Sequence, residues 1–349
     1  MAEYRVAVAG ATGLVGRTIL RVLEERDFPV RHLVPLASER SAGTAVTFRG
    51  EPVPVRVLDV NSFEGCDIAF FSAGASVSRR FAPVAAEQAL VIDNSSAFRL
   101  EPDVPLVVPE VNGDQVGRER RRIVANPNCS TIQMVVALEP LHRAFGLHEV
   151  IVSTYQSVSG TGARGIRTLD AELDRAGRAP DSPYPHRIAF NVLPHIDTFD
   201  PLGWTGEERK MIAETRKIMR LPDLHVVPTT VRVPVRVGHG EAVYARFDSE
   251  VDAAGARRIL ADAPGVIVRD DPHADVYPLS LDVEGHDEVF VGRLRPDPND
   301  SHALALWIAA DNLRKGAATN AVQIAEMALW SVFSTGTVPS FPSPTPPRA

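Results

Sequence analysis

The 349-residue chain has little cysteine and no long hydrophobic run. Cys66 and Cys129 are its only cysteines, which is too few for a disulfide framework or a structural zinc site, and we predict no metal. No apolar run approaches the roughly 20 residues that cross a bilayer, so we expect no membrane span. The start, Met-Ala-Glu-Tyr-Arg, lacks a signal-peptide pattern. These absences predict a cytoplasmic protein with free thiols.

An excess of basic charge is also missing, since 37 Lys and Arg residues stand against 44 Asp and Glu residues. The formal net charge of −7 lacks the basic excess typical of nucleic-acid binders, so we expect no nucleic-acid partner. The basic residues are almost all arginine, and Lys210, Lys217 and Lys315 are the only lysines, so each deserves inspection. A hydrophobic content of 44% and a charged content of 23% are ordinary for a globular protein, and the length suffices for two domains.

The N-terminus carries the pattern of a dinucleotide-binding unit. A buried strand at 4–9 leads into Gly10-Ala-Thr-Gly13-Leu-Val-Gly16, and a helical pattern follows at 17–25. Glycines in such a turn let the backbone approach a pyrophosphate, which then sits at the helix N-terminus. The spacing is a variant of the usual fingerprint, and a plain tight turn is the competing interpretation.

The ends of the next strands favour NADP as the cofactor. A strand at 30–37 ends in Ser38, Arg40 and Ser41, which would suit a 2′-phosphate better than NAD, although Glu39 lies among them. A solvated polar loop is the alternative. The strand at 68–71 ends in the small residues Ser72, Ala73 and Gly74, which would also permit close approach to a ligand.

Cys129 is the central candidate for chemistry. It follows a short apolar run and precedes a helical pattern from Ile132 to Leu141, with Asn128 and Ser130 as possible caps. A thiol at the start of a helix faces free N–H groups and the positive end of the helix dipole, which favour the thiolate. We therefore predict a nucleophile for an acyl group. A small buried residue in a strand-to-helix turn is the alternative.

The second half of the chain changes pattern. Alternating strands at 150–155, 242–247, 288–294 and 303–309 predict a mixed or antiparallel sheet, and a helix is expected at 204–219. Residues 229–237 read as one strand with Arg232 and Arg236 on one face. His239 then stands between two glycines, which would leave its ring free to reach a substrate.

Seven segments, in order, carry a family likeness between residues 10 and 320. They are Gly-Ala-Thr-Gly-Leu-Val-Gly, Ser-Glu-Arg-Ser-Ala-Gly, Asp-Asn-Ser-Ser-Ala-Phe-Arg, Asn-Pro-Asn-Cys-Ser-Thr, Tyr-Gln-Ser-Val-Ser-Gly, Arg-Val-Pro-Val-Arg-Val-Gly-His and Asn-Leu-Arg-Lys-Gly-Ala-Ala-Thr-Asn. With them the chain resembles the aspartate-β-semialdehyde dehydrogenases. This resemblance implies NADPH-dependent reduction of aspartyl-β-phosphate to aspartate semialdehyde through a cysteine thioester, with release of phosphate.

The resemblance also implies roles for individual residues. Cys129 would be the nucleophile, Gln156 would orient the substrate, and His239 would be the general acid/base. The remaining substrate contacts would be Arg232 for the carboxylate, Glu207 for the ammonium, and Arg99, Lys210 and Asn128 for the phosphate. Residues implied to line NADP are Gly10, Thr12, Gly13, Leu14, Val15, Ser38, Arg40, Ser41, Ser72, Ala73, Gly74, Ser159, Gly160 and Asn320.

The predicted architecture is α/β: a Rossmann-like NADP-binding domain plus an α+β catalytic and dimerisation domain with a mixed sheet. We expect the first domain at 1–128 and 316–338, the second at 129–315, and a disordered Pro-rich tail at 339–349. The resemblance further implies a homodimer. The alternatives are another acyl-phosphate or acyl-CoA reductase on this scaffold, such as an N-acetylglutamyl-phosphate or malonyl-CoA reductase, and a non-catalytic NADP-binding relative. Glu207 argues against an acetylated amine, and retention of Cys129 and His239 argues against loss of catalysis.

Overall fold

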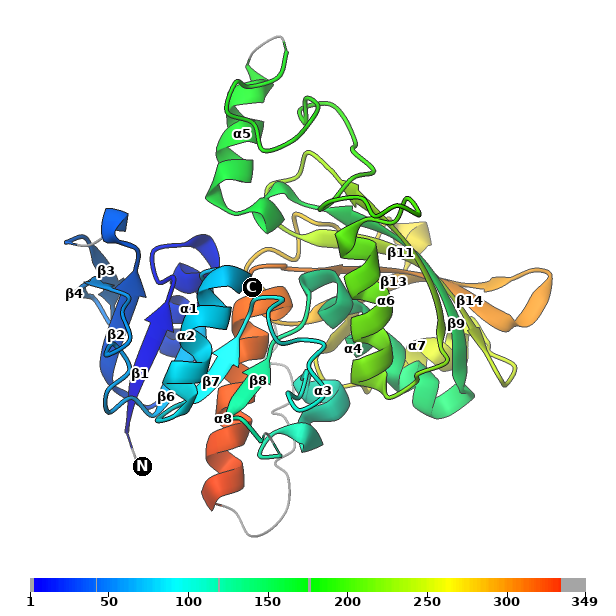
Figure 1. The fold of residues 1–349 in the computed structure, drawn as a ribbon. Coiled ribbons are helices and arrows are strands. Elements are labelled where there is room, and N and C mark those ends of the chain that lie inside the picture. Colours follow the sequence, from blue (N-terminus) through cyan, green and yellow to red (C-terminus); the bar gives the residue numbers. More distant parts are fainter. Residues whose placement is uncertain (1–2, 42, 119, 175–176, 334–349) are drawn as a thin grey trace.

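The computed structural model describes residues 3–41, 43–118, 120–174 and 177–333. Two six-stranded sheets dominate these residues and form two lobes side by side (Figure 1). The tail predicted at 339–349 lies outside the described residues. No helix in the described ranges has the length and apolar character that crossing a bilayer requires.

The first sheet is entirely parallel, with strand order β5-β2-β1-β6-β7-β8. Its strands are β1 (Tyr4–Ala9), β2 (Val30–Ala37), β5 (Arg56–Val57), β6 (Ile68–Phe71), β7 (Leu90–Asp93) and β8 (Ile123–Ala125). The chain moves outward from β1 in both directions, so the order reverses between β1 and β6. A crevice at such a reversal is where doubly wound sheets bind ligands. The predicted Rossmann-like architecture is confirmed.

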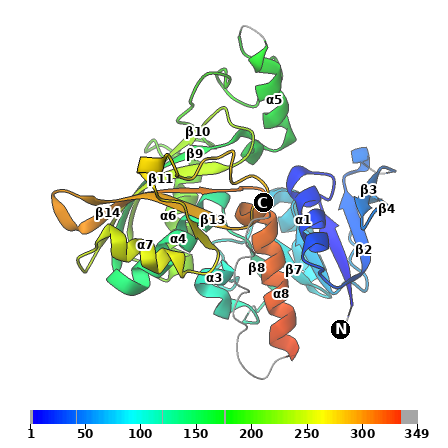
Figure 2. The same cartoon turned by 180° about the vertical axis from the view of Figure 1, so that it is seen from behind.

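Helices cover both faces of this sheet, as alternation along β1 dictates. Val6 and Val8 share a core with α1 (Leu14–Glu25) and α8 (Thr319–Phe333), whereas Ala7 and Ala9 face the core under α2 (Ala75–Ala86). Because α8 packs beside α1 on the N-terminal sheet, the end of the chain completes the first lobe (Figure 2).

The second sheet is mixed, as predicted, with order β10-β9-β11-β14-β13-β12. Its strands are β9 (Leu147–Gln156), β10 (His225–Arg232), β11 (His239–Phe247), β12 (Val266–Val268), β13 (Val289–Asp297) and β14 (Asp300–Ala310). The outer pairs β10–β9 and β12–β13 are parallel, and the inner pairs are antiparallel.

One face of the second sheet is covered by α4 (Cys129–Phe145), α6 (Gly206–Met219) and α7 (Ala253–Ala261) (Figures 1 and 2). Along β9, alternate side chains reach the opposite face, where Ile151 and Tyr155 stay exposed at 45% and 39%. α5 (Ala163–Leu173) projects from the body (Figure 1). The remaining elements are β3 (Ala45–Phe48), β4 (Glu51–Pro54), α3 (Pro109–Asn112), η1 (Glu39–Ser41), η2 (Gly113–Gln115), η3 (Val158–Thr161), η4 (Pro272–Ala274) and η5 (Arg314–Ala318).

One local prediction was wrong. The strand expected at 229–237 ends at Arg232, because Pro234 cannot continue the ladder. Arg232 is therefore buried, whereas Arg236 is exposed and pairs with Asp170. The segment before the last helix is a π-helical turn, η5, and Cys66 is buried at 3% exposure.

Candidate active site

A cavity of about 470 Å³ opens between the lobes, at the carboxyl ends of the first sheet's strands. It receives residues from the loops after β6, β7, β8 and β9 and from α6. The predicted site residues that line it are Val15, Ser72, Gly74, Arg99, Asn128, Cys129, Gln156, Ser159, Gly160, Glu207, Lys210 and Arg232. The fold therefore brings together side chains separated by more than one hundred residues in sequence.

Sequence reasoning missed part of this lining, and part of the predicted set lies elsewhere. Unpredicted lining residues include Asn94, Ser95, Asn126, Thr161, Asp197, Asn312 and Gly316. Predicted residues outside the lining are Gly10, Thr12, Gly13, Leu14, Ser38, Arg40, Ser41, Ala73, His239 and Asn320. The polar ends of β7 and β8 were a usable signal for Asn94 and Asn126, and Asn312 begins the last of the seven family segments, whereas no sequence pattern points to Asp197.

The glycine turn after β1 has the close packing that its sequence predicts. Gly10 has φ of +88°, and a Cβ there would lie 2.5 Å from the carbonyl oxygen of Ser72. A Cβ on Gly16 would lie 2.1 Å from the carbonyl oxygen of Gly10. Only glycine fits both positions, so the helix start lies directly against the strand ends.

The polar residues after β2 lie next to this turn. Ser41, in the single turn η1, is 3.5 Å from the hydroxyl of Thr12, measured between the two hydroxyl oxygens. Ser38 and Arg40 are exposed. Thr12, Arg40 and Ser41 thus share one surface beside the glycine turn, open to a ligand.

Asn320 departs from its predicted place. Its side chain is fully buried, and its amide nitrogen donates to Asn126 Oδ1 at 2.7 Å and to the Val107 carbonyl at 2.9 Å. Its oxygen accepts from Lys315 Nζ at 3.0 Å. These partners engage both ends of the amide inside the protein, so the predicted cofactor contact is not supported.

Cys129 is the first residue of α4, and Asn128 caps this helix. Asn128 Oδ1 accepts from the backbone N–H groups of Ser130 at 3.0 Å and Thr131 at 3.1 Å. Ser130, the other expected cap, lies inside the helix. The helix start is therefore as predicted, with the thiol directly after the cap.

The thiolate expected at this helix start is not favoured in the resting protein. Burial raises the pKa of Cys129 to about 12, and Glu207 adds to the rise, while Arg232, Arg99 and the Ser130 N–H oppose it. Loss of hydration outweighs the helix dipole here because Cys129 lies in a largely enclosed place beside a carboxylate. The helix start therefore favours the thiolate, as predicted, but burial and Glu207 oppose it more strongly.

The start of α6 places one negative side chain, Glu207, and one positive side chain, Lys210, at the cavity. Glu207 Oε1 accepts from Asn128 Nδ2 at 2.8 Å and from Gln156 Nε2 at 3.2 Å. Lys210 Nζ lies 2.7 Å from Asp197 and 3.5 Å from Glu207. Burial opposes the Lys210 charge, but the two carboxylates outweigh burial and raise its pKa. The cavity thus holds both a fixed carboxylate and a firmly charged ammonium.

Arg232 and His239 lie behind Gly160. A Cβ on Gly160 would lie 2.8 Å from Arg232 Nη1 and 3.5 Å from His239 Nε2. Arg232 donates to the Ser157 carbonyl at 2.7 Å. His239 is fully buried rather than free, and its Nδ1 accepts from the Ser157 N–H at 3.1 Å.

This backbone contact fixes the tautomer of His239. A backbone N–H only donates, so Nδ1 carries the lone pair and the proton of the neutral ring lies on Nε2. Burial, and then Arg232, hold the pKa of His239 well below its usual range. Among the described residues Nε2 has no hydrogen-bond partner. His239 is therefore a neutral ring with one available N–H.

Family profiles match both lobes. "Semialdehyde dehydrogenase, NAD binding domain" matches residues 5–118, and "Semialdehyde dehydrogenase, dimerisation domain" matches residues 138–315. The aspartate-semialdehyde dehydrogenase of Aquifex aeolicus is 54% identical to this chain, over 93% of this chain and 97% of the relative.

The chain belongs to the aspartate-semialdehyde dehydrogenase family.

Solved structures of aspartate-semialdehyde dehydrogenases have the same fold. The Vibrio cholerae enzyme II, described as complexed with ASA, has a TM-score of 0.89 and 46% identity, covering 94% of this chain and 99% of that one. The Candida albicans enzyme, described as with NADP, has a TM-score of 0.72 and 25% identity, covering 93% and 98%. These relatives support an amino-acid-biosynthetic oxidoreductase with an NAD(P)-binding domain.

The second sheet leaves no room for a side chain at Gly240, the residue after His239. A Cβ at this position would lie 2.4 Å from Cζ2 of Trp307 on the neighbouring strand β14. The large indole therefore occupies the space that a side chain here would need.

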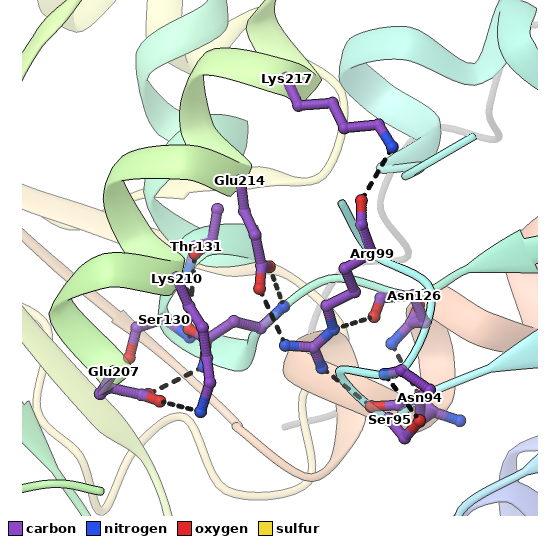
Figure 3. Close-up of polar contacts among 12 residues, drawn as sticks. Asn94, Ser95, Arg99, Asn126, Ser130, Thr131, Glu207, Lys210, Glu214 and Lys217 are labelled. Carbon is purple, nitrogen blue, oxygen red and sulfur yellow. Dashed lines mark hydrogen bonds and ion pairs between the residues drawn. The ribbon is translucent and has the colours of Figure 1, made fainter. Parts of the chain in front are cut away.

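Figure 3 shows one network of the aspartate-semialdehyde dehydrogenase site that the sequence did not reveal. Glu214 of α6 lies 3.0 Å from Arg99 Nη1 and accepts from the Asn128 N–H at 2.7 Å. Burial raises the pKa of Glu214, while Arg99 opposes the rise. Glu214 thus joins the predicted phosphate arginine to the residue that precedes the cysteine.

Proposed function

We propose that this protein catalyses NADPH-dependent reductive dephosphorylation of L-aspartyl-4-phosphate to L-aspartate-4-semialdehyde. The observation that carries the proposal is the convergence of Cys129, Glu207, Lys210 and Arg232 on one cavity. An amino-acid acyl phosphate presents a carboxylate, an ammonium, a phosphate and an electrophilic carbonyl. The cavity holds a group complementary to each of them.

Charge complementarity assigns the substrate contacts. Arg232, a planar donor, suits the α-carboxylate. Glu207 suits the α-ammonium, which would also neutralise the carboxylate that raises the pKa of Cys129. Lys210 and Arg99 suit the phosphate, and Gln156, within hydrogen-bonding distance of Glu207, would orient the reacting end. An acetylated amine would leave Glu207 without a partner, which disfavours an N-acetylglutamyl-phosphate substrate.

The first chemical step is acyl transfer to Cys129. Sulfur attacks the acyl carbon, the bond from carbon to the phosphate oxygen breaks, and the electron pair and the thiol proton leave with phosphate. The product is a thioester, and the backbone N–H groups at the start of α4 suit its developing oxyanion. Because the resting thiol is protonated, nucleophile formation depends on bound substrate rather than on the helix dipole.

We propose that His239 donates a hydrogen bond to the oxygen of the reacting carbonyl. Its available Nε2–H makes the neutral ring a hydrogen-bond donor on the side of Gly160. Donation would stabilise negative charge on the oxygen during reduction of the thioester. When the tetrahedral oxyanion collapses to the aldehyde, the carbon–sulfur bond breaks, its electron pair goes to sulfur, and one proton taken up from solvent restores the Cys129 thiol.

The structure supports an NAD(P) site on the first sheet, and we propose NADP as the natural cofactor. When bound, this cofactor supplies the hydride. A Cβ on Gly10 would clash with the Ser72 carbonyl, so glycine here keeps the start of α1 close to the strand ends, where the helix N–H groups suit a pyrophosphate. Ser38, Arg40 and Ser41, beside Thr12, suit a 2′-phosphate.

We further propose a homodimer, a cytoplasmic location, and domains at 1–128 with 316–338 and at 129–315. The exposed Ile151 and Tyr155 on the uncovered face of the second sheet support dimerisation there. The free thiols of Cys66 and Cys129 suit a reducing compartment.

The test is reduction of NADP, and separately of NAD, by purified protein supplied with aspartate semialdehyde, with and without phosphate. We expect phosphate-dependent reduction that prefers NADP. Activity with NAD alone would contradict the assignment at Ser38, Arg40 and Ser41, and absence of both activities would contradict the substrate.

Cys129→Ala tests the nucleophile. We expect turnover to fall by at least a thousandfold while the dissociation constant for NADPH changes less than about threefold, since the thiol acts on acyl transfer rather than cofactor binding. Cys66→Ala is the matched control and should keep full activity. Equal losses of turnover and NADPH binding would contradict the role of Cys129.

A further inference from the structure

Arg99, the proposed phosphate contact, is held firmly on three sides. It lies in the loop between β7 and α3, and it donates from Nε to the Asn126 carbonyl at 2.9 Å and from Nη2 to the Asn94 carbonyl at 2.8 Å (Figure 3). Its Nη1 donates to Glu214 at 3.0 Å. A guanidinium has five N–H donors, so two more are available to an anion in the cavity.

The backbone of the Arg99 loop is held by Lys217, a lysine with no part in the proposed chemistry. Its Nζ donates to the carbonyl oxygens of Arg99, Glu101 and Val104, each at 2.8 Å. These three bonds engage all three donors of an ammonium. The loop has neither helix nor strand here, so the Lys217 side chain supplies the hydrogen bonds that these three carbonyl oxygens would otherwise accept from backbone N–H groups.

Glu214 holds the other end of Arg99. One carboxylate oxygen accepts from Arg99 and the other from the Asn128 N–H at 2.7 Å. Two donors therefore need two acceptors at this point. A carboxylate supplies both, whereas an amide of the same shape supplies one acceptor and one donor. Glu214 consequently fixes Arg99 relative to the cap of the cysteine helix.

Glu207, Lys210, Glu214 and Lys217 repeat at i, i+3, i+7 and i+10, which is one face of a helix. Figure 3 shows these four side chains along one side of α6, directed toward the loop and the start of α4. A single helix of the second lobe thus contributes Lys210 directly and holds Arg99 of the first lobe at both its backbone and its guanidinium.

We propose that Lys217 and Glu214 are positioning residues for the phosphate site, acting through Arg99. This inference rests on the proposed phosphate role of Arg99. In this proposal α6 sets the distance between the two phosphate-binding cations, Arg99 and Lys210. Lys210 and Lys217 then both act at the phosphate site, the first directly and the second through Arg99.

The test begins with Lys217→Met, which keeps a similar length and removes the three donors. Initial rates of NADP reduction are measured with phosphate, aspartate semialdehyde and NADP varied in turn. We expect the KM for phosphate to rise by roughly tenfold, the order of effect of losing a charge-assisted contact, while the KM for NADP stays within twofold. Arg209→Met, which removes another cation from α6, is the matched control and should leave the KM for phosphate unchanged.

A double-mutant cycle with Arg99→Lys separates positioning from general stability. If Lys217 acts through Arg99, Lys217→Met should raise the KM for phosphate far less in the Arg99→Lys background. Additive effects, or a lower kcat with every KM unchanged, would overturn the proposal. If the double variant is too slow to assay, calorimetric binding of inorganic phosphate to the four proteins replaces the rates, with the same criterion.

Glu214→Gln provides an independent variant. It should also raise the KM for phosphate, because the amide cannot accept from both Arg99 and the Asn128 N–H. Glu139→Gln, which weakens the i,i+4 pair with Arg143 on α4, is its control. An unchanged phosphate KM in folded Glu214→Gln would overturn the role of Glu214. Inactive wild type would refute the proposed function instead, and an unaltered phosphate KM in Arg99→Lys would refute its premise.

Discussion

The reactivity of Cys129 tests the electrostatics of the site directly. With a pKa of about 12, set by burial and then by Glu207, the thiolate fraction at pH 7.5 is on the order of 10⁻⁴ to 10⁻⁵. Only the thiolate reacts with iodoacetamide. The alkylation rate of the free protein should therefore rise about tenfold per pH unit from pH 6 to pH 9, without a plateau.

Glu207→Gln should accelerate this reaction because it removes a negative charge that opposes the thiolate. If the pKa of Cys129 falls by about one unit, the thiolate fraction rises about tenfold and the intrinsic nucleophilicity falls about threefold, giving a net gain of about threefold. Glu139→Gln on the same helix as Cys129 is the control and should change nothing.

The assay follows alkylation by mass spectrometry in a Cys66→Ala background, so that each adduct reports on Cys129. A rate plateau between pH 6 and pH 8 would show a thiolate already formed in the resting protein and would refute this reasoning. A Glu207→Gln variant that reacts no faster would remove Glu207 as a cause of the raised pKa.

Three further variants test the framework of the site. The first variant is Glu241→Gln. Burial raises the pKa of the fully buried Glu241, so its carboxyl favours the folded state only while it is protonated. This contribution to stability is complete below the unfolded pKa near 4.3 and is lost as the pH rises toward the folded pKa. The variant's gain in unfolding free energy should therefore grow from pH 4.5 upward by about 1.4 kcal/mol per pH unit, and a gain that does not change with pH in denaturant melts would contradict this. Gly10→Ala should weaken NADP binding at least tenfold by fluorescence titration, because its φ of +88° and the 2.5 Å approach to Ser72 exclude a Cβ unless the glycine turn moves; unchanged affinity would contradict the role of this turn in cofactor binding. Lys315→Met leaves Glu110, 2.7 Å away, buried without its partner and should cost about 3–5 kcal/mol in denaturant unfolding, much of it recovered by adding Glu110→Gln; absence of recovery would contradict the pairing.

Much of the fold could be predicted from local patterns. The strands at 4–9 and 30–37 have the predicted ends, because apolar runs with glycine or serine at the boundary leave few alternatives. Arg232 and Arg236 show where this reasoning fails. Alternation predicted one strand through both, but Pro234 ends the ladder between them, and only tertiary packing decides that Arg232 turns inward.

The sequence by itself determined the reactive residue types and their neighbourhoods. Asn128 and Cys129 at a helix start follow from a short-range pattern, and so do the glycines after the first strand. Capping and turn geometry depend on a few adjacent residues, so the chain order is enough to predict them.

The tertiary structure alone decided the charge states and the supports. The raised pKa of Cys129 arises from burial and from Glu207, 78 positions away in the chain. The tautomer of His239 depends on the Ser157 N–H, and the place of Arg99 on Lys217 and Glu214. Hydration and Coulomb energies depend on distances through space, which the order of residues along a chain does not contain.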